Sequence, residues 1–166
     1  AQRRLPRQLS RRRRDHMQIR LESAAQPDVI ALIDALDAYQ KPLYPLESFH
    51  GVDIEALCRP NALFAVARDP QGHALGCCAM VLEADYAELK RLYVSPLSRR
   101  QGIGLALIDF LERIAAGHGR RRYRLETGVL QPEALALYAR AGYVPCAPFG
   151  DYVEDPHSLF YAKDTD

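Results

Sequence analysis

Two hydrophobic periodicities alternate along this chain of 166 residues. Apolar residues recur every three or four positions over residues 27–39, 105–116 and 133–141, which predicts amphipathic helices there. Short apolar runs bounded by turn residues predict seven strands, over residues 18–22, 62–68, 74–82, 86–94, 122–127, 143–144 and 159–163. We expect a short helix over 54–58 and an irregular, proline-containing loop over 40–51. The order of these elements predicts an α/β fold.

The most informative stretch joins the fourth predicted strand to the helix that follows it. It reads Arg99-Arg100-Gln101-Gly102-Ile103-Gly104. A glycine turn at a helix N-terminus presents backbone N–H groups that have no intrahelical acceptor, at the positive end of the helix dipole. Glycines also allow close backbone approach, which suits phosphate oxygens. The sequence therefore predicts a cradle for a pyrophosphate group.

Two familiar phosphate loops fit this stretch poorly. A dinucleotide fingerprint requires G-x-G-x-x-G after the first strand of a βαβ unit, whereas here the motif comes late and Ala106 and Leu107 follow it. A nucleotide-triphosphate loop requires Gly-Lys-Ser/Thr, which is missing. From the G-x-G spacing alone, the alternative to a phosphate cradle is an ordinary glycine-containing turn.

Taken as a whole, Arg99-x-x-Gly102-x-Gly104 after a strand ending Leu-Tyr-Val-x-Pro resembles the acyl-CoA signature of the GCN5-related N-acetyltransferases, the GNAT family. A second string, from Leu137-Tyr138 to Gly142-Tyr143, resembles the family string L-Y-x-x-x-G-F/Y. The resemblance extends in layout over residues 18–163 and is specific over about 88–143.

This resemblance implies a fold and an activity. The fold is a mixed, mostly antiparallel central sheet of about seven strands with helices on both faces, in which the fourth and fifth strands run parallel and splay apart. The activity is that of an acyltransferase: an N-acetyltransferase that moves an acetyl group from acetyl-CoA, its co-substrate, directly to a primary amine of a small molecule or peptide. Homodimers are common in the family, so a homodimer is left open.

The resemblance also implies which residues hold the cofactor. Main-chain groups near the end of the fourth strand would bind the pantetheine arm, and the glycine turn would bind the pyrophosphate. Two arginines of the turn would contact phosphate, or would equally be solvated surface charges. The set is Leu92, Val94, Arg99, Arg100, Gln101, Gly102, Ile103, Gly104 and Leu105. Many relatives carry an asparagine near the start of the next helix, where this chain has Gln131-Pro132, so that contact is in doubt.

Amine acetylation requires a group that removes the ammonium proton and a group that protonates the departing thiolate. Tyr138, in the second string, is the expected acid; otherwise it is a core aromatic. Glu88 is the first choice for the base, acting through a water, and its alternative is a solvent-facing carboxylate on a strand. Glu126 is the second choice. Many family members use no dedicated base.

The family shapes its acceptor site with the segments that match residues 40–50 and 148–152 here. Both segments mix aromatic and acidic side chains, a combination that suits a cationic amine and suits ordinary loop packing equally well. The residues expected to bind the acceptor are Tyr44, Glu47, His50 and Tyr152.

Composition limits the remaining possibilities. With 48% hydrophobic and 26% charged residues and no apolar run of about eighteen, the chain reads as soluble, without a membrane span. The four cysteines (58, 77, 78 and 146) include no C-x-x-C pair, so we expect buried, reduced thiols and a cytoplasmic protein, with a disulfide or a catalytic cysteine as the alternative. The histidines show no metal-ligand spacing, and no metal site is expected.

Charge is distributed unevenly. Residues 1–14 hold seven arginines and no acid, which leaves 15 basic and 21 acidic residues elsewhere. We expect residues 1–16 to form a flexible basic arm and residues 17–166 to form one domain. Nucleic-acid binding through the arm is an alternative function, although the acidic body argues against it. A second alternative is an acyl-CoA-binding regulatory module with weak catalysis.

Overall fold

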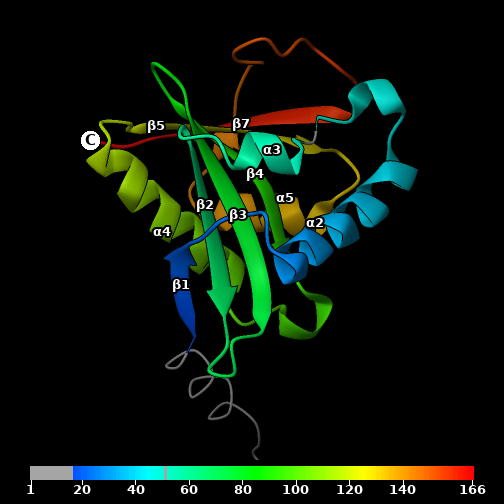
Figure 1. Ribbon diagram of the computed structural model, residues 1–166. Helices are drawn as coiled ribbons and strands as arrows, with labels where there is room; N and C mark the ends of the chain where they lie inside the picture. The colour runs from blue at the N-terminus through cyan, green and yellow to red at the C-terminus, as the bar shows by residue number, and fades with distance from the viewer. Residues whose placement is uncertain (1–16, 51) are drawn as a thin grey trace, which may run out of the picture.

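The computed structural model describes residues 17–50 and 52–166, and the expected basic arm lies outside them. Within this part of the chain one sheet has the strand order β1-β2-β3-β4-β5-β7-β6 (Figure 1). Neighbouring strands are antiparallel except β4 and β5, which are parallel. The strands are β1 (Gln18–Leu21), β2 (Ala62–Arg68), β3 (Ala74–Leu82), β4 (Ala87–Val94), β5 (Arg122–Gly128), β6 (Val144–Pro145) and β7 (Ser158–Asp164). The mixed sheet predicted from the sequence is therefore confirmed.

Helices cover both faces of this sheet (Figure 1). They are α2 (Pro27–Gln40), α3 (Ile54–Leu57), α4 (Ile103–Gly117) and α5 (Pro132–Arg140). The segment expected to be an irregular loop contains two short 3₁₀ turns, η1 (Lys41–Leu43) and η2 (Leu46–Ser48), and a third, η3 (Pro96–Ser98), precedes α4. Within the described residues no helix is long and apolar enough to span a membrane.

Two hydrophobic clusters, one on each face of the sheet, hold these layers together. On one face Leu107 and Leu111 of α4 pack with Leu89 and Leu125 of the central strands. On the other face, residues of α2 and α3 pack against alternate residues of β2 and β3, including Val29, Leu36, Leu57, Phe64 and Val66. Cys77 and Cys78 are fully buried on opposite faces, as expected, but Cys58 is exposed and Cys146 only partly buried; all four are free thiols.

A buried ion pair anchors the C-terminal end of α5. The carboxylate of Glu112 on α4 accepts hydrogen bonds from Lys163 Nζ (2.6 Å) and from the Tyr143 hydroxyl (3.1 Å). Lys163 Nζ also donates to the carbonyl of Ala141, just after α5 (2.8 Å). The Glu112 side chain is only 9% exposed, so this pair ties α4, α5 and β7 together from inside the protein.

A β-bulge reshapes the end of β4. Tyr93 pairs with Cys77 and Lys90 pairs with Ala79, so Arg91 and Leu92 together stand opposite a single residue of β3. Arg91 adopts a left-handed conformation with φ of 59°. The extra residue puts Lys90 and Arg91 on the same face of the sheet, toward α2.

Beyond the bulge, alternate residues turn toward the two faces. Leu92 and Val94 pack with the α4-side cluster, whereas Tyr93 belongs to the α2-side cluster. Arg91 reaches α2, where its guanidinium donates to Asp37 (2.6 Å).

The parallel pairing of β4 with β5 is short. It consists of Ala87 with Tyr123, Glu88 with Arg124, and Leu89 with Leu125. Past Leu89 and Leu125 both strands continue without pairing to each other, β4 to Val94 and β5 to Gly128. The expected splay between the two strands is therefore present at their C-terminal ends.

Candidate active site

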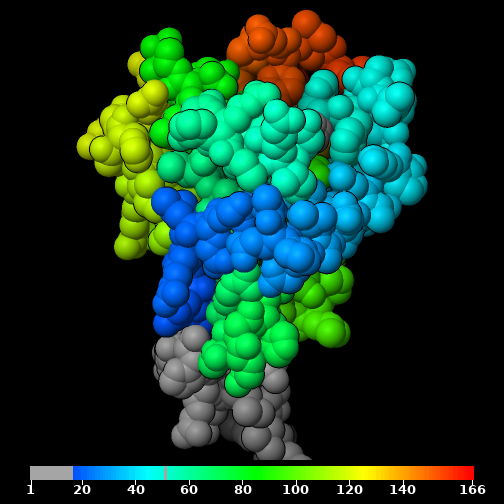
Figure 2. Space-filling view, in the orientation of Figure 1, coloured from blue at the N-terminus to red at the C-terminus, as the bar shows by residue number. Residues whose placement is uncertain are grey.

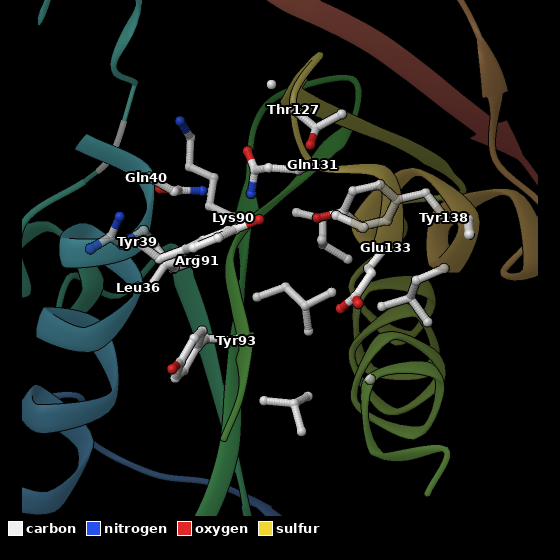
Figure 3. Close-up of a pocket in the computed structure, with 18 of the residues that line it drawn as sticks. Leu36, Tyr39, Gln40, Lys90, Arg91, Tyr93, Thr127, Gln131, Glu133 and Tyr138 are labelled. Carbon is white, nitrogen blue, oxygen red and sulfur yellow. The ribbon is translucent and has the colours of Figure 1, made fainter. Parts of the chain in front are cut away.

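A cavity of about 660 Å³ occupies the splay between β4 and β5. Figure 3 shows Leu36, Tyr39 and Gln40 of α2 on one side of it, and Glu133 and Tyr138 of α5 on the other. Because both faces of the sheet contribute to its lining, the cavity connects the α2 side of the protein with the α4 and α5 side.

The N-terminus of α4 forms one end of this cavity. The first backbone hydrogen bond of the helix runs from Ala106 N–H to the Gly102 carbonyl (3.1 Å), so the amides of Ile103, Gly104 and Leu105 have no intrahelical acceptor. No side chain in the described part of the chain caps them, and all three residues line the cavity. Gly102 has φ of 79°, a left-handed conformation that favours glycine.

Gly104 brings α4 close to α5. A Cβ atom placed there would lie 2.8 Å from Leu137 Cδ2. Three open amides, a positive helix end and a close backbone approach together fit a pyrophosphate group. The cradle therefore stays the prediction for this helix end.

The end of β4 offers free main-chain groups to the same cavity. Ser95 N–H donates to the Leu75 carbonyl (2.8 Å), and hydrogen-bonded pairs alternate with non-hydrogen-bonded pairs in an antiparallel ladder. Val94, opposite Gly76, therefore directs its N–H and C=O away from β3. The Val94 carbonyl accepts from Arg99 Nε (2.9 Å), leaving the amide available.

The structure brings most of the predicted cofactor residues to the cavity. Leu92 and Val94 line it, as do both arginines of the turn and the α4 amides. Arg99 also stacks over the Tyr93 ring, with its guanidinium carbon 5.6 Å from the ring centre. Gln101 is half-buried and is not among the lining residues, so the structure does not bring it to the site.

Tyr138 lies on the α5 side of the cavity, beneath Thr127 of β5 in the view of Figure 3. It is 8% exposed, and its ring meets the edge of the Tyr143 ring. Burial raises the pKa of Tyr138 far above its ordinary value, with nearby Cys78 and Glu126 acting in the same direction. The hydroxyl is therefore protonated and can act as a proton donor inside the cavity.

On the α2 side, Glu88 is held in a dense set of polar contacts. Its carboxylate accepts from the Tyr152 hydroxyl (2.6 Å) and lies 3.2 Å from Lys90 Nζ. Lys90 Nζ in turn donates to Tyr152 Oη (2.8 Å) and to the His50 carbonyl (3.3 Å). The side chains of Glu88 and Lys90 are 8% and 16% exposed, so this is a buried, internally neutralised pair.

Glu126 stands on the same side of the sheet and also lines the cavity. Burial raises its pKa above the usual value of 4.5, while the Ser158 hydroxyl, His50 and Lys90 oppose that shift. Its carboxylate forms no ion pair in the described residues, in contrast to Glu88.

Two loops enclose the α2 side of the cavity. Ser48 of η2 donates to Asp155, in the loop before β7 (2.6 Å), and the His50 ring meets the edge of the Tyr152 ring. Figure 2 shows the surface of residues 40–50 in cyan next to that of residues 148–157 in orange. Of the predicted acceptor residues, Tyr44, His50 and Tyr152 line the cavity; Glu47 is exposed and does not.

Several lining residues were not predicted from the sequence. Lys90 follows Glu88 by two positions on the same strand, and this spacing alone places both on one face. Arg91 is brought to that face by the bulge, for which the sequence offers no glycine or proline as a signal. Gln131, which stood only as a doubtful contact, is buried at the start of α5 and accepts a hydrogen bond from Tyr44 (3.1 Å).

Known proteins are similar to this chain in sequence. The family model described as the acetyltransferase (GNAT) family matches residues 30–143. The IAA acetyltransferase of Azospirillum brasilense is 41% identical over 144 residues, covering 86% of this chain and 94% of that protein. The uncharacterised N-acetyltransferase YsnE of Bacillus subtilis is 30% identical over 151 residues, covering 89% and 99%.

Solved structures agree with these relatives. A candidate acyl-CoA N-acyltransferase from Klebsiella pneumoniae superposes with a TM-score of 0.76 at 36% identity, over 89% of this chain and 97% of that one. An N-acetyltransferase of Thermoplasma acidophilum, solved in complex with coenzyme A, shares the fold with a TM-score of 0.69 at 20% identity, over 90% and 99%. The chain therefore belongs to the GNAT acetyltransferase family and is an N-acetyltransferase that uses acetyl-CoA.

Proposed function

We propose that the amine acceptor and acetyl-CoA enter the splay from opposite faces of the sheet. Glu126 is then the general base and Tyr138 the general acid. The observation that carries this proposal is the cavity between β4 and β5, which has the α4 cradle and Tyr138 on one face and Glu126 on the other. The acceptor is a primary amine of a small molecule or peptide.

The α4 amides and the free edge of β4 would hold the cofactor. Ile103, Gly104 and Leu105 present the N–H groups that suit the pyrophosphate, and the Val94 amide faces the splay. When bound, acetyl-CoA supplies the acetyl group and the thiolate that departs. A donor such as the Val94 N–H stabilises negative charge that develops on a carbonyl oxygen in a water-poor site.

We propose Glu126 as the base in preference to Glu88, the first choice from the sequence. Glu88 already accepts from Tyr152 and faces the ammonium of Lys90, so its carboxylate is occupied and neutralised. Glu126 forms no ion pair with any described residue, and burial raises its pKa toward the range in which a carboxylate is an effective proton acceptor. It would take the proton from the acceptor ammonium, directly or through a water.

Tyr138 is the proposed acid. Burial keeps its hydroxyl protonated at any physiological pH, so it holds a proton ready for a departing thiolate. Its place on α5, next to the cradle formed by α4, puts this proton on the cofactor side of the sheet.

We also propose a domain boundary and a cellular location. Residues 17–166 form a single catalytic domain, supported by the one continuous sheet from β1 to β7. A cytoplasmic location is supported by four free cysteines, two of them fully buried.

The first test is thermal unfolding with acetyl-CoA, with NADH and ATP as controls. A ligand at a hundred times its dissociation constant adds about 2.7 kcal/mol of stability, so acetyl-CoA alone should shift the transition. Release of free thiol with a panel of small amines and lysine peptides then measures turnover. Binding without turnover on any amine would favour the regulatory acyl-CoA-binding module instead.

Two substitutions test the proton carriers. Tyr138→Phe should lower kcat by about 10²-fold with little change in acetyl-CoA binding, because a general acid contributes at least that much. Tyr86→Phe, outside the cavity, is the matched control. Glu126→Gln should remove the acidic limb of the pH–rate profile, with the exposed Glu83→Gln as control. An acidic limb that persists in Glu126→Gln would return the role of base to Glu88 or to no residue.

A further inference from the structure

Tyr44 is fixed against the end of β5 by contacts on several sides. Its hydroxyl accepts from Leu130 N–H (3.1 Å) and donates to Gln131 Oε1 (3.1 Å). The same hydroxyl occupies the space beside Gly128, because a Cβ atom on that glycine would overlap it. His157 meets the edge of the tyrosine ring on another side, with ring centres 6.4 Å apart. Tyr44 is therefore a held side chain with a defined position.

This position lies close to the proposed base. Glu126 and Gly128 are two residues apart on β5, so they face the same side of the sheet, and their Cα atoms are separated by about 6.6 Å along the strand. Both residues and Tyr44 line the cavity. Consider an acceptor whose amine lies at Glu126 and whose carbon chain runs along β5 toward Gly128. This carbon chain would contact the Tyr44 ring within about 6.6 Å, the two-residue repeat of a strand.

The other boundaries of the acceptor side are also tied in place. Ser48 donates a hydrogen bond to Asp155, and Lys90 donates hydrogen bonds to the His50 carbonyl and to Tyr152. These contacts join the segment 40–50 to the segment before β7 across the cavity. The acceptor side is thus enclosed by fixed contacts from three elements.

We propose that Tyr44 is the end wall of the acceptor site, that it sets an upper limit on acceptor length, and that the physiological acceptor is a compact small amine instead of a peptide. This inference rests on the function proposed above, since it takes Glu126 as the place of the amine. Gly128 is required for this wall, because the absence of a side chain there leaves the space that the Tyr44 hydroxyl fills.

The test measures kcat/KM for straight-chain primary amines from ethylamine to octylamine, together with a short lysine peptide. The wild type should acetylate the short amines and lose activity as the chain lengthens. Tyr44→Ala should raise the ratio of octylamine to ethylamine activity by about tenfold or more, since apolar pockets discriminate methylenes by at least that factor. Tyr44→Phe keeps the ring and should keep the length limit.

Gly128→Ala provides an independent route to the same change. The added methyl group displaces the Tyr44 side chain without altering its chemistry, so this variant should extend the length limit as Tyr44→Ala does. The double variant should resemble either single variant, because both changes remove one wall. Tyr86, whose hydroxyl packs on Gly150 away from the cavity, is the matched control, and Tyr86→Ala should leave the length profile unchanged.

Three results would overturn the inference: an unchanged length profile in both Tyr44→Ala and Gly128→Ala, additive effects in the double variant, or a wild-type preference for the lysine peptide. None of these contradicts the proposed function, because each still requires acetyl-CoA binding and amine turnover. Loss of turnover on every amine and peptide in the wild type would instead contradict the proposed function itself.

Discussion

Replacing Lys163 with methionine should destabilise the protein far more than an ordinary loss of one charge. The change removes the ammonium that neutralises Glu112. The Glu112 side chain lies on the buried side of α4 and is only 9% exposed, so its carboxylate would be left without that partner. It also removes the hydrogen bond to the Ala141 carbonyl at the end of α5. Among the described residues, the Tyr143 hydroxyl would remain as the other side-chain donor to Glu112.

The magnitude follows from the burial of the two partners. Removing one member of a buried ion pair costs about 3–5 kcal/mol, because a charge stays buried without compensation. The Lys163 side chain is 27% exposed, which lets water reach the vacated place, so we expect the lower end, about 3 kcal/mol. For a domain of this size each kcal/mol shifts Tm by about 2–4 °C, so Tm should fall by about 6–12 °C.

Thermal unfolding followed by circular dichroism measures this shift, and α4 itself supplies the control. Arg113 and Asp109 form an exposed ion pair on the same helix, with side chains 79% and 61% exposed. Surface pairs contribute about 0–1 kcal/mol, so Arg113→Met should barely move Tm. A Lys163→Met variant that unfolds within a degree or so of Arg113→Met would refute the reasoning about the buried pair.

Two other stability predictions concern the site itself. Because burial raises the pKa of Glu126 above 4.5, the folded protein binds this proton more tightly than the unfolded chain, and the stabilisation is lost as pH rises through that raised pKa. At neutral pH Glu126→Gln should therefore raise Tm while lowering the rate; a lower Tm at pH 7 would contradict this sign. Gly102→Ala places a side chain at φ of 79°, which should cost about 1 kcal/mol and weaken acetyl-CoA binding, measured by its thermal shift; unchanged affinity would argue against the cradle.

The part of the fold that follows from local pattern was predictable from the sequence. Helical spacing placed α2, α4 and α5, and the glycine turn at Gly102 and Gly104 placed the N-terminus of α4, which is the proposed cradle. These features depend on residues close together in the chain, where periodicity and turn chemistry act directly. Pro132 shows the limit of precision: α5 begins at this residue, one position before the predicted start, because proline is tolerated in the first turn.

The acceptor side was less predictable because its contacts join distant residues. Tyr44 and Gln131 are separated by 87 positions, and no periodicity signals that pairing. Glu88 illustrates a different limit, because its strand position was predicted but its hydrogen bond with Tyr152 depends on a loop that is distant in the chain. Carboxylate roles therefore could not be ranked from sequence spacing alone.

The extra residue in β4 has a consequence for how this protein tolerates insertions and deletions. Removing Arg91 would leave a chain that could pair regularly with β3 along its whole length, free of the left-handed residue. Because Lys90 and Arg91 share a face, the residues on both sides of this deletion would keep their present faces and their present partners on β3. Leu92 and Val94 would stay on the α4 side and Tyr93 on the α2 side, and the loss would be the hydrogen bond from the Arg91 guanidinium to Asp37 of α2. The register of β4 should therefore survive the loss of this one residue, and the harm should be confined to the lost contact between β4 and α2.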